Sequence, residues 1–167
     1  FKGIEASVRS ILRDTGSLQA AIEKLAKIQN LRREFTALLG SLSAAKREVA
    51  EIQRFTAGQK LFGLDDAGRA ARELQILTRG AFAGRNALQM IGDSAAASSQ
   101  RIELVAQRVG TLYRELQDGN PIRATAGALV SMGVITEGMA NHLASMQENG
   151  ASAMEVFSEL TKELSKA

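Results

Sequence analysis

Between Ser17 and Ala57, apolar residues recur at the spacing of one helix face. From Ile28 onward the steps between them alternate between three and four residues, which is the heptad-like pattern of a coiled coil. The pattern predicts a single helix over residues 17–57, which would reach about 60 Å at about 1.5 Å per residue. A shorter stripe over residues 2–13 predicts an earlier helix that stops near Gly16, with Ser17 capping the long one.

A helix of that length cannot bury its whole apolar stripe against a small domain. We therefore expect it to pair with other copies of itself, with an earlier helix or with a partner, and we predict a homo-oligomer. The predicted self-association seam consists of Ile28, Leu31, Phe35, Leu38, Leu42, Val49 and Ile52.

The second half of the chain is divided by glycines into shorter helical segments. Six helices are predicted, over residues 66–77, 85–97, 98–117, 122–132, 136–148 and 151–165. Asp65, Ser98 or Ser99, and Thr136 are the expected N-caps, and Asp118–Pro121 is the strongest stop. The predicted fold is all-α, with a long coiled-coil-like arm (residues 1–60) followed by a small irregular bundle of short helices (residues 61–167).

Composition removes several classes of chemistry from consideration. The 167 residues include no cysteine, no tryptophan and one histidine, which excludes thiol catalysis, a Cys-ligated metal and a multi-histidine metal site within one chain. Basic and acidic residues number 21 and 18 and interleave along the chain, so no specific nucleic-acid readout is expected. No apolar run is long enough to span a membrane.

The residues that could carry chemistry all have a simpler structural interpretation. No motif in the sequence indicates a catalytic partner for His142. Asp65, Asp66 and Glu103 could be paired carboxylates, but they also suit helix starts. The loop at residues 80–85 has two glycines but lacks the Lys and Ser/Thr of a phosphate loop. Four methionines are expected to fill the bundle core: Met132, Met139, Met146 and Met154. We predict no enzyme, no catalytic residue, no metal and no cofactor.

Several glycine-containing stretches resemble a segment found in tape measure proteins of long-tailed phages and prophages. They are residues 74–84, 88, 91–96, 102–103, 109–113, 119–122, 129–135 and 146–152, so that the resemblance spans roughly residues 60–165. It rests on glycine and apolar positions and supplies no site residues.

The resemblance implies a structural component of a phage tail, assembled in the bacterial host cytoplasm and located in the virion tail. Such a protein sets tail length while tail-tube subunits polymerise around it, and it assists DNA delivery during infection; tail-tube and tail-assembly proteins would be its partners. Because the chain opens with Phe1 and not with Met, we expect it to be a piece of a larger protein. Two alternatives remain: a coiled-coil interaction or scaffold module unrelated to tails, and an enzyme fragment such as a cell-wall hydrolase.

Overall fold

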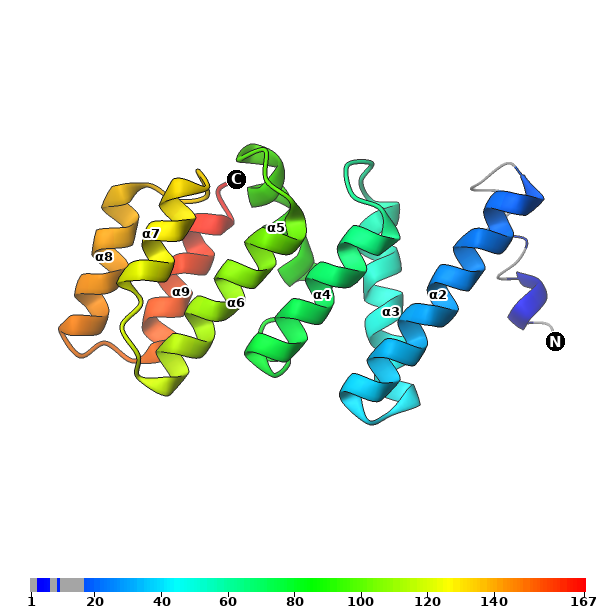
Figure 1. Ribbon diagram of the computed structural model, residues 1–167, viewed down its shortest axis with the longest axis horizontal. Helices are drawn as coiled ribbons and strands as arrows, with labels where there is room; N and C mark the ends of the chain where they lie inside the picture. Colours follow the sequence, from blue (N-terminus) through cyan, green and yellow to red (C-terminus); the bar gives the residue numbers. More distant parts are fainter. Residues whose placement is uncertain (1–2, 7–8, 10–16) are drawn as a thin grey trace. The chain divides into compact units, whose positions relative to one another are not determined.

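The computed structural model describes residues 3–6, 9 and 17–167, and every regular element in these ranges is an α-helix (Figure 1). The all-α prediction is therefore confirmed for this part of the chain, whereas the expected helix over residues 2–13 lies mostly outside it. The labelled helices are α2 (Leu18–Leu39), α3 (Leu42–Ala57), α4 (Leu64–Thr78), α5 (Gly84–Ala97), α6 (Ile102–Asp118), α7 (Arg123–Ser131), α8 (Glu137–Glu148) and α9 (Ala153–Leu164).

The chain forms two compact units, residues 1–50 and residues 51–167, and the boundary falls inside α3. In the first unit, Ser17 caps α2 as predicted, because its side chain accepts a hydrogen bond from the backbone N–H of Ala20 at 3.2 Å. The prediction of one helix over residues 17–57 is wrong. Gly40 adopts a left-handed conformation (φ 68°) and ends α2, and the hydroxyl of Ser41 then accepts from Ala44 and starts α3. The heptad pattern hid this break because its apolar spacing continues across the turn.

The second unit is built around two helices that run in the same direction, α4 and α6. Arg69 near the start of α4 contacts Glu103 near the start of α6, and Leu77 near the end of α4 lies against Gly110 further along α6. A Cβ atom on Gly110 would lie 2.8 Å from the Leu77 Cβ, so only glycine permits this approach without a shift. Of the two, α6 lies at the centre of the unit, where it packs against α4, α5, α7 and α9, and α5 links α4 to α6 along the chain.

The six helices predicted over residues 61–167 correspond to α4–α9. Thr136 caps α8 as expected, through a hydrogen bond from the Met139 N–H at 3.1 Å. The helix starts predicted at Asp65 and at Ser98 or Ser99 are wrong. Gly63 is the N-cap of α4, so that Asp65 falls in its first turn, where a negative charge suits the positive end of the helix.

Ser98 ends a helix and does not begin one. Its hydroxyl donates to the Ser94 carbonyl at 2.6 Å, one turn back, and α5 therefore runs to Ala97 with Ser98 as its C-cap. The next helix, α6, begins three residues after Ser99 at Ile102. In the described ranges, no helix is both long and apolar enough to cross a membrane.

Candidate functional site

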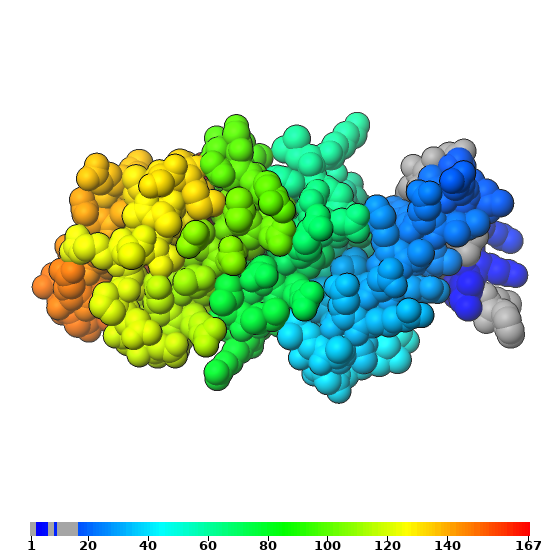
Figure 2. All heavy atoms as spheres, in the orientation of Figure 1, coloured from blue at the N-terminus to red at the C-terminus, as the bar shows by residue number. Residues whose placement is uncertain are grey.

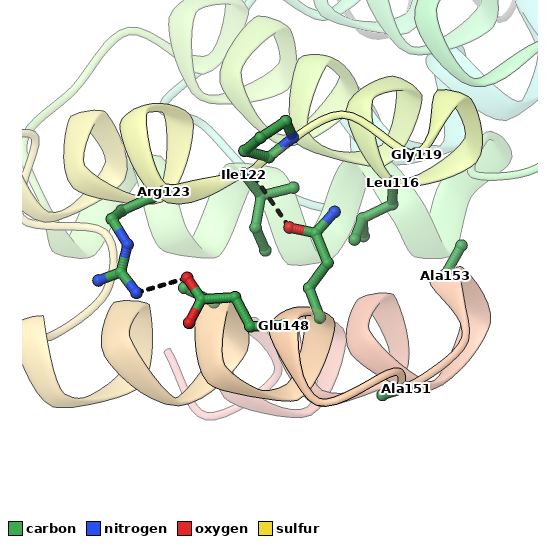
Figure 3. A pocket seen from close by; sticks show the side chains of 10 residues that line it. Leu116, Gly119, Ile122, Arg123, Glu148, Ala151 and Ala153 are labelled. Carbon is green, nitrogen blue, oxygen red and sulfur yellow. Dashed lines mark hydrogen bonds and ion pairs between the residues drawn. The ribbon is translucent and has the colours of Figure 1, made fainter.

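A shallow groove of about 440 Å³ lies where the end of α6 meets α7, α8 and the start of α9. Figure 3 shows its lining side chains arising from these helices and from the α6–α7 and α8–α9 connectors. Most of the lining is apolar or small: Leu116, Pro121, Ile122, Ala144, Ala151 and Ala153. We take this groove as the candidate functional site because it combines an apolar floor with a few fixed polar groups.

Gln147 at the end of α8 holds the connector that borders the groove. Its side-chain amide donates to the Asn120 carbonyl at 2.7 Å, and its side-chain oxygen accepts from the Ile122 N–H at 3.1 Å. One side chain thereby satisfies two backbone groups on either side of Pro121, a residue that has no N–H of its own.

Arg123 and Glu148 form an ion pair at the rim of the groove, with 2.7 Å between the guanidinium nitrogen and the carboxylate oxygen (Figure 3). Both side chains are about 60% exposed, so the pair contributes no more than about 1 kcal/mol to stability. Its effect is to join the start of α7 to the end of α8.

A partly buried carboxylate lies between α6 and α7. Oε1 of Glu115 accepts from the Thr125 hydroxyl at 2.8 Å, whereas its buried Oε2 has no hydrogen-bond partner among the described residues. A buried polar atom in that position costs free energy because it has lost its water without replacement. The α6–α7 interface is therefore incompletely satisfied.

The only histidine lies on α8 and faces a charged row on α9. The imidazole Nε2 of His142 is 3.9 Å from a carboxylate oxygen of Glu159, and Lys162 donates to the same carboxylate at 2.9 Å. The hydrogen bond and positive charge of Lys162 lower the pKa of Glu159, with smaller lowering by His142 and Lys166. Next along α9, the hydrogen bond to Glu163 raises the pKa of Lys166. These groups are exposed or half-exposed, and the arrangement is that of a solvated ionic surface.

The candidate carboxylates of α4 and α6 are only partly brought together. Asp66 and Glu103 both contact the Arg69 guanidinium, at 3.2 and 3.4 Å, and Glu103 also pairs with Arg101 at 2.9 Å. Because both carboxylates contact the same guanidinium, Arg69 ties the start of α6 to α4. Asp65 is exposed in the first turn of α4.

The glycine loop that resembled a phosphate loop uses its glycines for backbone geometry. Gly80 and Gly84 both have positive φ, at 81° and 84°. The Arg85 N–H, at the start of α5, donates to the Glu51 carboxylate at 3.3 Å, so the chain itself supplies the anion there.

The seven predicted seam residues fall into two groups. Leu38 and Leu42, on either side of the Gly40 turn, are 38% and 54% exposed. The other five are buried within the chain: Ile28, Leu31, Phe35, Val49 and Ile52. Their role in self-association remains a prediction, but five of them already have a place in the folded monomer.

Two further sequence predictions can be compared with the described residues. Met132, Met139 and Met146 are half-buried, but Met154 is 79% exposed and does not belong to the core. No group of three or more potential metal-ligating side chains occurs within the described ranges.

No sequence pattern indicates the polar contacts around the groove. Gln147 is 25 residues from Ile122 and 27 from Asn120, and Glu115 is 10 residues from Thr125. Only one local signal was available: the Asn–Pro connector leaves backbone groups that a side chain elsewhere must satisfy.

No protein-family model, curated protein or solved structure matches the chain.

Proposed function

We propose that this chain is a helical structural segment of a phage or prophage tape measure protein, a non-enzymatic component that sets tail length during assembly and assists DNA delivery. The supporting observation is that the glycines that carry the resemblance also build the second unit. Five have positive φ and end or begin helices: Gly80, Gly84, Gly119, Gly133 and Gly150.

Two other glycines of the resemblance allow close packing. Gly110 approaches Leu77 as described above, and a Cβ on Gly92 would lie 2.9 Å from the ring of Phe55. The pattern therefore encodes a specific arrangement of helices. That is the kind of similarity expected of a structural segment, whose function depends on its fold and length.

A ruler function predicts that tail length follows residue count and not residue identity. In the phage or prophage that encodes the chain, duplicating α2, which has 22 residues, should lengthen the tail by about 33 Å if the added segment is helical in the tail. Electron microscopy of purified tails measures this directly.

The matched control replaces α2 with an unrelated helical segment of equal length. A ruler predicts unchanged tail length for the replacement and a longer tail for the duplication. Unchanged tail length after duplication, or a coding frame that ends near residue 167 outside a set of tail genes, would contradict the proposal.

The alternative of an interaction or scaffold module is favoured by one observation. Leu18 and Ile22 lie one turn apart on α2 and are 63% and 59% exposed. A module that binds through this face would lose its partner when α2 is replaced by an unrelated helix, whereas a ruler would keep its length. The replacement experiment therefore separates the two functions.

A further inference from the structure

We propose that Asn149 is a site of spontaneous covalent modification, at which the backbone nitrogen of Gly150 displaces the side-chain amide and the residue becomes aspartate or isoaspartate. This inference concerns the chemistry of the α8–α9 connector and does not depend on the tail assignment.

The reaction takes place within the chain, and water is its co-reactant. The Gly150 nitrogen loses its proton and attacks Cγ of Asn149, so that a bond from nitrogen to Cγ forms and the side-chain nitrogen leaves as ammonia. Water then opens the resulting succinimide ring at one of its two carbonyl carbons. Opening at the side-chain carbonyl gives aspartate, whereas opening at the main-chain carbonyl gives isoaspartate, in which the backbone runs through Cγ.

The residue after the asparagine favours this attack. Glycine carries no side chain that would crowd its nitrogen, and its backbone turns freely. Asn149–Gly150 is the only Asn–Gly pair among the five asparagines of the sequence. The fold itself calls for glycine there, because φ of Gly150 is 89°, a conformation that other residues rarely adopt.

The other asparagines lack this combination. The nitrogen that follows Asn120 belongs to Pro121 and has no proton to lose. The remaining three lie inside helices α2, α5 and α8, where a residue with a side chain follows each one and the helical backbone keeps its nitrogen away from the asparagine Cγ: Asn30, Asn86 and Asn141.

The Asn149 side chain is accessible and unrestrained. Asn149 is exposed, and its amide makes no hydrogen bond among the residues that the structure describes. Figure 2 shows the end of α8, in orange, at the surface of the second unit. Water can therefore reach the ring that the reaction forms.

The backbone at the end of α8 controls the rate. The Gly150 N–H donates to the Gln147 carbonyl at 3.1 Å, and the Ala151 N–H donates to the Met146 carbonyl at 2.9 Å, which is the Schellman arrangement that commonly ends a helix. Because the Gly150 nitrogen must turn toward Cγ, the first of these bonds must break. Helix ends open locally at a small free-energy cost, so the reaction proceeds in the folded chain, but more slowly than in an unfolded one.

Both products change the charge at the end of α8. Each adds a carboxylate directly after Glu148, at the negative end of the helix, and removes one unit from the formal net charge of +3. Isoaspartate also lengthens the main chain between α8 and α9. A sample of the folded chain should therefore separate into charge forms as it ages.

Ageing of the purified full chain tests the site. After incubation at mildly alkaline pH, isoelectric focusing should show a growing acidic form, and tandem mass spectrometry should locate aspartate and isoaspartate at position 149. Asn149→Gln should abolish this form, because a longer side chain closes the ring far more slowly. Asn141→Gln is the matched control, since Asn141 is also exposed on α8, and should leave the acidic form unchanged.

Two results would overturn the proposal. One is conversion of another asparagine before Asn149 in the folded chain. The other is an Asn149 that stays intact in the folded chain over a period in which the chain unfolded in urea is fully converted.

The comparison with urea also tests the control by the backbone. Unfolding removes both Schellman hydrogen bonds, so Asn149 should convert at least about tenfold faster in urea than in the folded chain. Equal rates in the two states would contradict the role assigned to these bonds.

The end of α6 provides a matched second position. Gly119 follows Asp118 with φ 73°, and the Asn120 N–H donates to the Glu115 carbonyl at 2.8 Å, as Ala151 does to Met146. The backbone arrangement is the same, but a carboxylate replaces the amide. Asp118→Asn should therefore create a second site that converts at a rate similar to that of Asn149. An Asn at position 118 that stays intact while Asn149 converts would show that an exposed Asn–Gly pair at a helix end is not sufficient, and would contradict the argument.

Discussion

Two glycines in helix interiors show how strongly the effect of one residue depends on its neighbours. Gly110 in α6 faces Leu77 so closely that an added Cβ must displace it, whereas Gly127 in α7 has no heavy atom within 4 Å of that position. Both positions would gain helix propensity from alanine, by about 1 kcal/mol. Packing therefore decides whether alanine raises or lowers the stability of the chain at Gly110, and helix propensity decides it at Gly127.

We expect Gly110→Ala to destabilise the chain by about 1–3 kcal/mol, because α4 and α6 must move apart. Gly127→Ala should instead stabilise it by about 0.5–1 kcal/mol. Urea unfolding followed by far-UV circular dichroism measures both. Stabilisation by Gly110→Ala would mean that α4 and α6 do not approach as closely as described.

The ionic row on α9 leads to a prediction about pH. Because Lys162 lowers the pKa of Glu159, the folded state binds a proton there less readily than the unfolded state. The resulting stability is present above the unfolded-state pKa, near 4.5, and is lost as the pH falls through the lowered folded-state value. Glu159→Gln should therefore be less stable than the natural chain near neutral pH and should converge with it in acid.

Thermal unfolding between about pH 3 and pH 7 tests this, and added salt should shrink the difference because the pair is exposed. Glu73→Gln is the control, since Glu73 has no ion pair in the described part of the chain. If Glu159→Gln and the natural chain differ in thermal stability by the same amount at every pH, the lowered pKa of Glu159 is not the cause of the difference.

At the scale of elements, local signals predicted the helices better than their ends. Thr136 was identified as a cap because its hydroxyl acts within three residues, and the α6 stop was predicted from Gly119 and Pro121. The prediction that Ser98 begins a helix is wrong because a serine hydroxyl can bond to a carbonyl one turn back as well as to an N–H ahead, and the sequence does not distinguish the two. The break at Gly40 does not show in the apolar periodicity, because that spacing reports which face is buried and can continue across a short turn between two helices.

The groove could not be predicted at all, for a different physical reason. Its polar contacts join positions 25 and 27 residues apart in sequence, and they depend on where α8 ends relative to the α6–α7 connector. Gln147 resembles any surface glutamine on an amphipathic helix until that arrangement is known. Sequence periodicity identifies buried faces, whereas sites made by convergent helix ends require the tertiary structure.

At the scale of the whole molecule, self-association can be separated from folding. Phe35 is completely buried, so Phe35→Ala should destabilise the chain by about 3–5 kcal/mol, whatever its oligomeric state. Leu42 belongs to the same predicted seam but is 54% exposed. If copies meet along the seam, Leu42→Ser should weaken association with little loss of stability.

Light scattering over a range of concentrations provides the measurement, paired with urea unfolding of each variant. Leu61→Ser is the matched control, because Leu61 is 72% exposed but lies outside the seam. Association that weakens with Leu42→Ser and not with Leu61→Ser would place the contact between copies beside the Gly40 turn. A natural chain that stays monomeric at every concentration would contradict the prediction, and the apolar spacing of α2 and α3 would then serve only to build the monomer.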